Sequence, residues 1–274
     1  MDRRKFIKTC LAGSVGASLA PSYALAGTSL DGEDYVKDYL SKIKNFNQHF
    51  SDDIVLRGSD YRLLKSVTSR IKRLQSYVGY ANFSLLSFDR ALYYAKNYSR
   101  IGSFTKAEIN FLESIFYTNA KDYGFFGEKV LLHITDHVKN RDIIKIPRTG
   151  HYVFRGESLR FYHRIRREVG RSVTLTSGVR GVMKQMYLFL AKSVESKGNL
   201  SMASRSLAPP GHSYHGVGDF DVGKVGYGYK NFTEDFAKTD EFKRLKDLGF
   251  VRIRYHEKNP FGVRYEPWHI KVIG

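Results

Sequence analysis

The sequence predicts an α+β fold, in which a mainly helical N-terminal region precedes a domain built on an antiparallel sheet with flanking helices. Up to about residue 145, apolar residues recur at three- and four-residue steps, which is typical of amphipathic helices. Pro147 and Gly150 interrupt this pattern. Beyond them, β-branched segments mix with helical ones without a βαβ rhythm. The 274 residues, 42% of them hydrophobic, suffice for one or two domains.

The first region, residues 27–147, contains two well-marked helices. One covers SDYRLLKSVTSRIKRLQSYV, whose apolar face consists of Leu64, Val67, Ile71, Leu74 and Val78. The other begins with a capping box, in which Thr105 is the N-cap and Glu108 follows three residues later. The sequence does not indicate what this region does.

The second region, residues 148–274, alternates between helices and strands. SLRFYHRIRREVG and VMKQMYLFLAKSVESKG predict helices that end at Gly170 and Gly198, and SVTLTSG between them predicts a strand. NFTEDFAKTDEFKRLKDLG predicts one helix or two short ones. FVRIRYHEKNPFGVRYEPWHIKVI predicts two strands joined by a turn at residues 259–262.

Residues 1–26 are typical of a cleaved export signal. Arg3 and Arg4 precede a short apolar run, and the sequence Ala-Leu-Ala ends at Ala26, which suits signal cleavage. The paired arginines favour the twin-arginine (Tat) type and a location in the periplasm or cell envelope. Lys8 disagrees with a lipoprotein signal around Cys10, the only cysteine, so the exported chain would form no intramolecular disulfide. No later segment is apolar for the ~20 residues that a membrane span needs.

The chain is strongly basic, with a formal net charge of +18. Residues 1–26 account for +3 of it, which leaves +15 after cleavage. Such a charge favours polyanions as binding partners. Export argues against nucleic acid as the partner and favours anionic wall polymers or acidic lipid surfaces. A protein whose main function is polyanion binding would lose its ligand steeply with salt and would not depend on zinc.

Two short segments together predict a metal site. PPGHSYHGVGDFDVG supplies His215 and a choice of Asp219 or Asp221, and EPWH supplies Glu266 and His269. Zinc in hydrolytic sites takes three such ligands and leaves one position for water. A neighbouring carboxylate then accepts a proton. Glu266 and His269 stand three apart beside a proline, so we expect a turn or an irregular strand end to aim both at one point.

Three ordered motifs resemble those of the VanY-type D-alanyl-D-alanine carboxypeptidases, whose superfamily also contains the lysostaphin-like peptidases and the hedgehog signalling domain. The first is Ser177-Gly178-Val179-Arg180 with Gln185 five residues after the arginine, the second is Ser213, His215 and Gly218, and the third is Glu266, Trp268 and His269. The resemblance covers about residues 150–274 and implies a hedgehog/DD-peptidase-like fold.

The resemblance also implies roles for these residues. His215, an aspartate and His269 would hold zinc, and Glu266 would be the catalytic base. Arg180 would bind a substrate carboxylate or carbonyl oxygen and stabilise the tetrahedral intermediate, as a guanidinium fork can. Gln185 and Ser213 would orient the peptide. Trp268 is better explained by core packing.

The aspartate departs from the family's spacing. The family usually has six residues between histidine and aspartate, and that position is Val222 here. A one-residue deletion after Gly218 would make Asp221 the ligand, which we favour, while Asp219 is the alternative or a partner that holds a histidine ring N–H. His212 is expected at the surface or next to the ligands rather than among them.

A second histidine pair is not expected to bind metal. His133 and His137 in HITDH stand four apart, as in the H-E-x-x-H zinc motif, but Ile134 replaces the glutamate.

The function predicted first is zinc-dependent removal of a terminal D-alanine from peptidoglycan stem peptides. D,D cleavage of pentapeptides, L,D cleavage of tetrapeptides and endopeptidase cleavage of cross-links all stay open, because the sequence does not reveal the pocket. A non-catalytic wall-binding module on the same fold is the alternative, although such a module should lack a base, and Glu266 is present. The oligomeric state is not predicted.

Overall fold

The structure of the protein is a computed structural model that describes residues 32–250 and 253–272. The predicted export signal, residues 1–26, lies outside this range. The α-helices are α2 (Gly32–Lys44), α3 (Gly58–Val78), α4 (Tyr80–Phe83), α5 (Phe88–Asn97), α6 (Lys106–Tyr117), α7 (Glu157–Glu168), α8 (Val182–Glu195), α9 (Leu200–Ser206) and α10 (Asp240–Asp247). Short 3-10 helices are η1 (Ala120–Tyr123), η2 (Asn140–Asp142), η3 (Tyr214–Gly216), η4 (Gly228–Phe232) and η5 (Glu234–Lys238).

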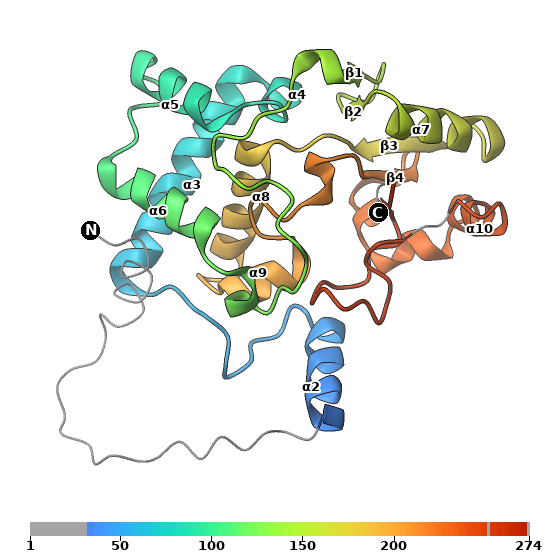
Figure 1. Cartoon of the computed structure of the whole chain (residues 1–274), viewed down its shortest axis with the longest axis horizontal. Helices are drawn as coiled ribbons and strands as arrows, with labels where there is room; N and C mark the ends of the chain where they lie inside the picture. Colours follow the sequence, from blue (N-terminus) through green and yellow to red (C-terminus); the bar gives the residue numbers. More distant parts are fainter. Residues whose placement is uncertain (1–31, 251–252, 273–274) are drawn as a thin grey trace.

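The predicted α+β fold is confirmed. Helices dominate the N-terminal part, and two small antiparallel sheets follow. One sheet is a hairpin of β1 (Ile143–Lys145) and β2 (Tyr152–Phe154). The other has the order β3-β4-β5 and consists of β3 (Val173–Ser177), β4 (Phe220–Lys224) and β5 (His269–Ile270). In Figure 1, α3, α5 and α6 lie on one side of the molecule, β3, β4 and α10 on the other, and α8 and α9 between them.

The expected apolar pattern of α3 forms the centre of a large core. Leu64, Val67, Ile71 and Leu74 are fully buried. They pack with residues of α5 and α6, and also with Met183, Met186, Phe189, Leu190 of α8 and Leu200, Ala203 of α9. Helices from both sides of the predicted boundary at residue 148 therefore share one core. The boundary itself stays a prediction.

A second core lies beneath the three-stranded sheet. It combines apolar residues of α7, β3, β4 and α10 with Trp268 and Ile270. Trp268 is 3% exposed, so its expected place in the core is confirmed. This core supports the strands that carry the polar residues described below.

Local expectations are met where the sequence has helical periodicity or caps. The capping box at Thr105 and Glu108 is present at the start of α6, with both reciprocal hydrogen bonds. The predicted strand at residues 172–178 is β3, and the predicted helix before Gly198 is α8. The segment predicted as one helix or two short ones, residues 231–249, forms η5 and α10.

Two local expectations are wrong. Between Tyr117 and residue 143 the chain forms loops and 3-10 turns rather than α-helices, and the exposed His133 and His137 lie outside any helix. The expected C-terminal hairpin is reduced to β5 and an isolated bridge between Ile253 and Ile270. Asn259 Nδ2 donates to the carbonyl oxygens of His256 and Val263, and these hydrogen bonds hold the intervening loop. Among the described residues, no helix has the length and apolarity needed to cross a bilayer.

Candidate metal centre

Strand register brings the two predicted halves of the site together. Asp221 of β4 lies directly opposite His269 of β5, so both side chains point to the same face of the sheet. On the other edge of β4, Ser177 of β3 pairs with Asp221 across a register shift that follows Leu175. Such irregularities re-aim side chains beside functional sites. Val222, the position that the usual family spacing selects, points to the opposite face and is fully buried in the second core.

The loop before β4 brings His215 to the same point. His215 lies in η3, and its carbonyl oxygen accepts a hydrogen bond from the Arg180 backbone N–H at 3.2 Å. Its ring Nδ1 lies 2.8 Å from the carbonyl oxygen of Gly178. At Gly178 any side chain is excluded, because an added Cβ would lie 1.9 Å from the carbonyl oxygen of Tyr152. Gly178 therefore allows the chain to pass close to Tyr152 of β2, and the carbonyl oxygen of Gly178 orients the histidine from this position.

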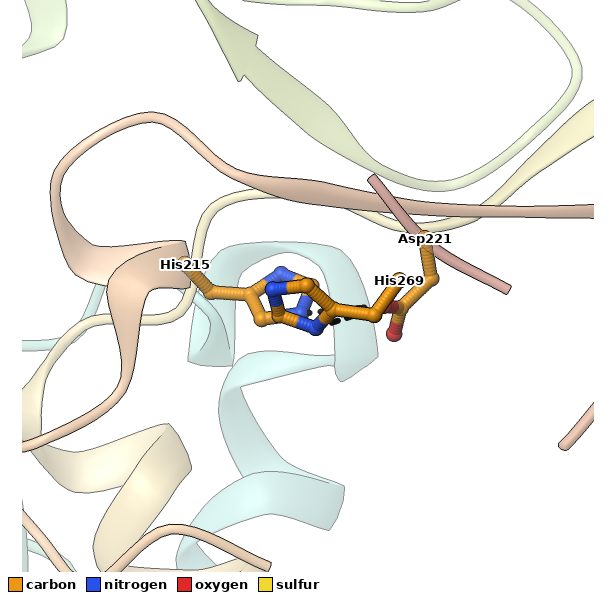
Figure 2. A group of neighbouring side chains, drawn as sticks. All are labelled: His215, Asp221 and His269. Atoms are coloured by element: carbon orange, nitrogen blue, oxygen red, sulfur yellow. Dashed lines mark hydrogen bonds and ion pairs between the residues drawn. The ribbon is translucent and has the colours of Figure 1, made fainter. Parts of the chain in front are cut away.

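His215, Asp221 and His269 converge in a buried cluster. Their ligand atoms all lie within 4.8 Å of one another (Figure 2). His215 Nε2 lies 3.1 Å from Asp221 Oδ1, and His269 Nδ1 lies 3.4 Å from the same oxygen. These side chains are between 0% and 2% exposed. Their role as ligands stays a prediction.

Outer hydrogen bonds assign the tautomers of both rings. The Gly178 carbonyl can only accept, so Nδ1 of His215 carries the proton and Nε2 presents a lone pair to Asp221. The carboxylate of Asp219 lies 3.1 Å from His269 Nε2, which assigns the proton there and turns Nδ1 inward. Two neutral rings and one carboxylate then point three acceptors at one point. A cation satisfies this donor set, so the residues fit a metal ion.

Without a cation, a proton on His269 relieves the repulsion between these three acceptor atoms. Burial opposes charge on this ring, but its hydrogen bonds to Asp219 and Asp221 raise the pKa of His269 to about 9. Burial and the nearby Arg180 lower the pKa of His215 to about 4, so this ring stays neutral. Burial opposes ionisation of Asp221, yet the surrounding positive charge keeps its pKa well below the ordinary value.

Asp219 lies outside the cluster and supports it. Its Oδ2 accepts from Arg254 Nε at 2.6 Å as well as contacting His269, and its Oδ1 accepts from the Val272 backbone N–H at 2.9 Å. The guanidinium of Arg254 also lies over the ring of Tyr214, 3.4 Å from its centroid. Asp219 thus has the geometry of the histidine-holding partner rather than that of a ligand.

Arg254 was missed by the sequence analysis. It is 6% exposed and pairs with an aspartate that is 2% exposed. A buried carboxylate needs a cationic or hydrogen-bonding partner. Asp219, the first aspartate of the GDFD segment, was therefore the available indication that a buried arginine lies elsewhere in the chain.

Glu266 borders the cluster without joining it. Its Oε2 lies 3.7 Å from His269 Nδ1, and its backbone N–H donates to the Tyr255 carbonyl oxygen at 2.9 Å. The His269 N–H donates to the Glu266 carbonyl oxygen at 3.1 Å, which closes the expected turn. Burial raises the pKa of Glu266 to about 7. The carboxyl group can therefore exchange a proton near neutral pH.

Arg180 reaches the cluster from the β3–α8 loop. Its Nη2 donates to Asp221 Oδ2 at 2.5 Å and its Nε donates to Ser177 Oγ at 2.9 Å. The other carboxylate oxygen of Asp221, Oδ1, therefore faces the two histidine rings. The guanidinium is held beside the cluster by an ion pair and one hydroxyl.

The remaining predicted residues lie around this centre. Gln185 is buried in α8, where its Nε2 donates to the Ala208 carbonyl oxygen at 2.6 Å and its Oε1 has no hydrogen-bond partner among the described residues. Ser213 is buried immediately before η3. Their contacts with a substrate stay predictions. His212 is also buried, but its Nδ1 lies 3.2 Å from the Gly127 carbonyl oxygen and its ring packs on Phe125.

A buried His-Asp-His set with a glutamate beside it could hold a metal ion next to a proton-accepting group. Residues 158–274 match the family model for VanY, D-alanyl-D-alanine carboxypeptidase. This match confirms the resemblance seen in the three motifs, over the part of the chain that contains the whole cluster. No curated protein matches the chain.

Several solved structures are similar to part of the chain. The LD-carboxypeptidase LdcB, from a study of peptidoglycan recognition, is 21% identical, with a TM-score of 0.42 over 50% of this chain and 70% of its own. A mutant of the vancomycin-resistance D,D-pentapeptidase VanY in complex with Zn(II) is 22% identical, with a TM-score of 0.37 over 48% and 78%. VanYB in complex with D-alanine-D-alanine is 24% identical, with a TM-score of 0.37 over 48% and 77%.

Proposed function

We propose that this protein is a zinc-dependent carboxypeptidase that removes the terminal D-alanine from peptidoglycan stem peptides. The observation that carries the proposal is the convergence of His215 Nε2, Asp221 Oδ1 and His269 Nδ1, with Glu266 beside them. The VanY family match over residues 158–274 supports the substrate class.

His215, Asp221 and His269 would hold the zinc ion. Zinc bound in such a site lowers the pKa of water to roughly 7 and polarises a carbonyl group. The two outer hydrogen bonds, from His215 to Gly178 and from His269 to Asp219, keep both rings oriented as ligands.

Glu266 is the proposed general base and acid. Its carboxylate accepts the proton of the attacking water, whose oxygen bonds to the carbonyl carbon of the last peptide bond. The C–N bond then breaks, and the proton passes from Glu266 to the departing nitrogen. The products are free D-alanine and a peptide that is one residue shorter and ends in a new carboxylate.

Arg180 would stabilise the negative charge that develops on the carbonyl oxygen or hold the substrate's terminal carboxylate. Its link to Ser177 holds the guanidinium in place for either role. Gln185 and Ser213 would orient the peptide. We place the reaction outside the cytoplasm, in the periplasm or cell envelope, because residues 1–26 have the pattern of a twin-arginine signal.

The test is mass spectrometry of muropeptides after incubation with the protein, with and without a chelator. Chelator-sensitive loss of alanine from pentapeptides is the expected D,D activity. The same loss from tetrapeptides alone would identify an L,D-carboxypeptidase, and cleaved cross-links would identify an endopeptidase. If no species changes while zinc is bound, the catalytic proposal is wrong and the domain is a binding module.

Glu266→Gln tests the role of the base. We expect turnover to fall by roughly 10²–10⁴-fold, the usual contribution of a general acid–base group, while bound zinc measured by elemental analysis stays at the wild-type level. Glu257→Gln, which alters an exposed glutamate of the same C-terminal segment, is the matched control and should leave turnover unchanged. Wild-type activity in Glu266→Gln would exclude this residue as the base.

A further inference from the structure

A large cavity lies outside the family-matched segment. It has a volume of about 810 Å³, is open to solvent, and is lined by residues of α3, α4, α5, η2 and the β1–β2 hairpin. Figure 1 shows α4, α5, β1 and β2 along one edge of the molecule. Its size lies within the range of ligand sites in proteins, ~300–1,000 Å³. None of the residues assigned to the metal centre lines it.

The cavity is lined by tyrosine rings. Tyr77, Tyr94, Tyr98 and Tyr152 contribute to the wall. The ring centroids of Tyr77 and Tyr98 lie 4.5 Å apart, and those of Tyr94 and Tyr98 lie 5.8 Å apart. Tyr77 is 44% exposed and Tyr98 is 38% exposed, although both lie against neighbouring rings. Together they form an open aromatic platform of amphipathic rings.

The polar groups of the cavity suit a neutral ligand rich in hydroxyl and amide groups. Asn82 and Asn140 line it, and side-chain amides supply both donors and an acceptor oxygen, although Asn82 Nδ2 already donates to the Val78 carbonyl oxygen at 3.1 Å. Arg90, whose Nη2 donates to Tyr94 Oη at 2.9 Å, is the one lining residue with a formal charge among those described. A groove for single-stranded nucleic acid needs a row of cations along the backbone path, and this cavity lacks one.

The wall of the cavity is joined to the loop that carries Arg180. The carbonyl oxygen of Tyr152 accepts from the Val179 N–H at 2.7 Å. The carbonyl oxygen of Ser84, next to the lining residue Leu85, accepts from the Gly181 N–H at 2.8 Å. Hydrogen bonds on both sides of Arg180 therefore hold the cavity close to the metal centre. An extended stem peptide of five residues spans at most ~17 Å.

We propose that this tyrosine-lined cavity binds the glycan strand of peptidoglycan while the attached stem peptide enters the metal centre. The inference rests on the proposed function, because the stem peptide connects the two sites. Amino-sugar rings present an apolar C–H face that packs on tyrosine, and their hydroxyl and acetamido groups meet Asn82, Asn140 and Arg90. The helical N-terminal region thereby selects wall-linked substrate over free peptide.

The first experiment measures binding of the purified protein to peptide-free glycan strands and to a soluble N-acetylglucosamine oligomer. Replacement of both platform rings, Tyr77→Ala with Tyr98→Ala, should weaken binding roughly tenfold or more, as expected for the loss of aromatic stacking. Tyr229→Ala, which removes a 77% exposed tyrosine of η4 away from the cavity, is the matched control and should bind like the wild type. Asn82→Ala tests the polar wall in the same assay.

The second experiment compares two substrates. The double variant should retain its catalytic efficiency on a free pentapeptide and lose it, through a higher KM, on the same peptide linked to glycan. A wild-type protein that does not bind peptide-free glycan would overturn the inference. Wild-type affinity in both the double variant and the Asn82→Ala variant, each with a wild-type melting temperature, would also overturn it. Comparable affinity for a single-stranded oligonucleotide, lost in the double variant, would identify a platform for bases instead.

These outcomes separate this inference from the proposed function. Binding to peptide-free glycan requires no peptidase activity. A protein that binds glycan through Tyr77 and Tyr98 but cleaves no muropeptide would leave the glycan site standing and remove the proposed reaction. A protein that cleaves free pentapeptide but does not bind glycan would support the proposed reaction and remove the glycan site.

Discussion

At the scale of single residues, the histidines of the candidate metal centre differ in the charge that their surroundings favour. His215 has a carbonyl oxygen behind its ring, whereas His269 has the carboxylate of Asp219 behind it and that of Asp221 in front. The pKa of His215 is lowered to about 4 and that of His269 is raised to about 9. When no metal is bound, a proton on His269 is therefore favoured at neutral pH, and a metal ion that binds there would have to displace it.

This difference predicts how zinc affinity depends on pH. Zinc competes with the proton on His269, so affinity should rise by about tenfold per pH unit between pH 7 and pH 9 and level off above it. An unperturbed histidine would reach its plateau near pH 6.5. Competition with a chromophoric chelator across this range measures the dissociation constant. A flat profile between pH 7 and pH 9 would contradict the prediction.

Asp219→Asn is the matched variant. It removes the negative charge behind His269 and replaces the carboxylate with an amide of nearly the same shape. The pKa of the ring should then fall, so the plateau should move to lower pH. At pH 9, loss of the orienting carboxylate should still weaken zinc binding by roughly 10–100-fold. An unchanged profile in Asp219→Asn would show that Asp219 does not set the proton affinity of His269.

The sequence left two candidates for the acidic ligand, Asp219 and Asp221. The motif indicated that one of them lies with His215 and His269, and that the other could hold a ring N–H. The pairing of Asp221 with His269 and the irregularity opposite it are properties of the sheet. They depend on contacts far apart in the chain, so spacing within GDFD did not decide between the two aspartates.

At the scale of elements, the segment that precedes α3 is clamped to α9. Arg205 of α9 donates from Nη1 and Nη2 to the two carboxylate oxygens of Asp53, at 2.7 and 3.0 Å. Its Nη2 also donates to the carbonyl oxygen of Gln48 at 2.8 Å, and Asn199 Nδ2 donates to Asp53 at 2.6 Å. Both charged side chains are nearly inaccessible to water. The clamp ties the N-terminal segment to the family-matched part of the chain.

Asp53→Ala should destabilise the protein by about 3–5 kcal/mol, because it leaves the guanidinium of Arg205 buried without its carboxylate. The neighbouring Asp52 is the matched control, since its exposed carboxylate pairs with Lys42. Asp52→Ala should cost less than about 1 kcal/mol. Chemical denaturation measures both changes in the free energy of unfolding. Equal effects of the two substitutions would contradict the assignment of Arg205 and Asp53 as a buried pair.

The helices that the sequence predicted correctly have a periodic apolar face or a cap. Leu64, Val67, Ile71 and Leu74 follow one stripe of α3, and Thr105 caps α6. The segment between Tyr117 and residue 143 has no periodic apolar face, and apolar residues there are buried by distant partners instead. Phe125, for example, packs with Tyr255 and Val263 in a small separate core. Such burial has no local period, so the helical expectation was wrong there.

At the scale of the whole molecule, the family-matched part does not contain all of its own core. Met183, Met186, Phe189 and Leu190 of α8 are completely buried, and they pack in the cluster that α3, α5 and α6 supply. The sequence placed a boundary near residue 148 because the pattern changes there. Periodicity along one helix shows that a face is apolar but not which distant helices cover it.

This packing predicts that residues 148–274 do not fold alone. Burial of each large apolar side chain contributes about 1.5–3 kcal/mol, so exposing the α8 face removes an amount comparable to the whole stability of a typical domain, ~5–15 kcal/mol. The isolated fragment should be insoluble or should unfold without a cooperative transition, whereas residues 27–274 should show one. Circular dichroism during denaturation compares the two chains. Co-expression of residues 27–147 as a separate chain should restore solubility and zinc binding, because it returns α3–α6 to the exposed face of α8. A monomeric fragment that unfolds cooperatively on its own would instead show that residue 148 is a true domain boundary, and that the N-terminal helices are an attached layer rather than half of the core.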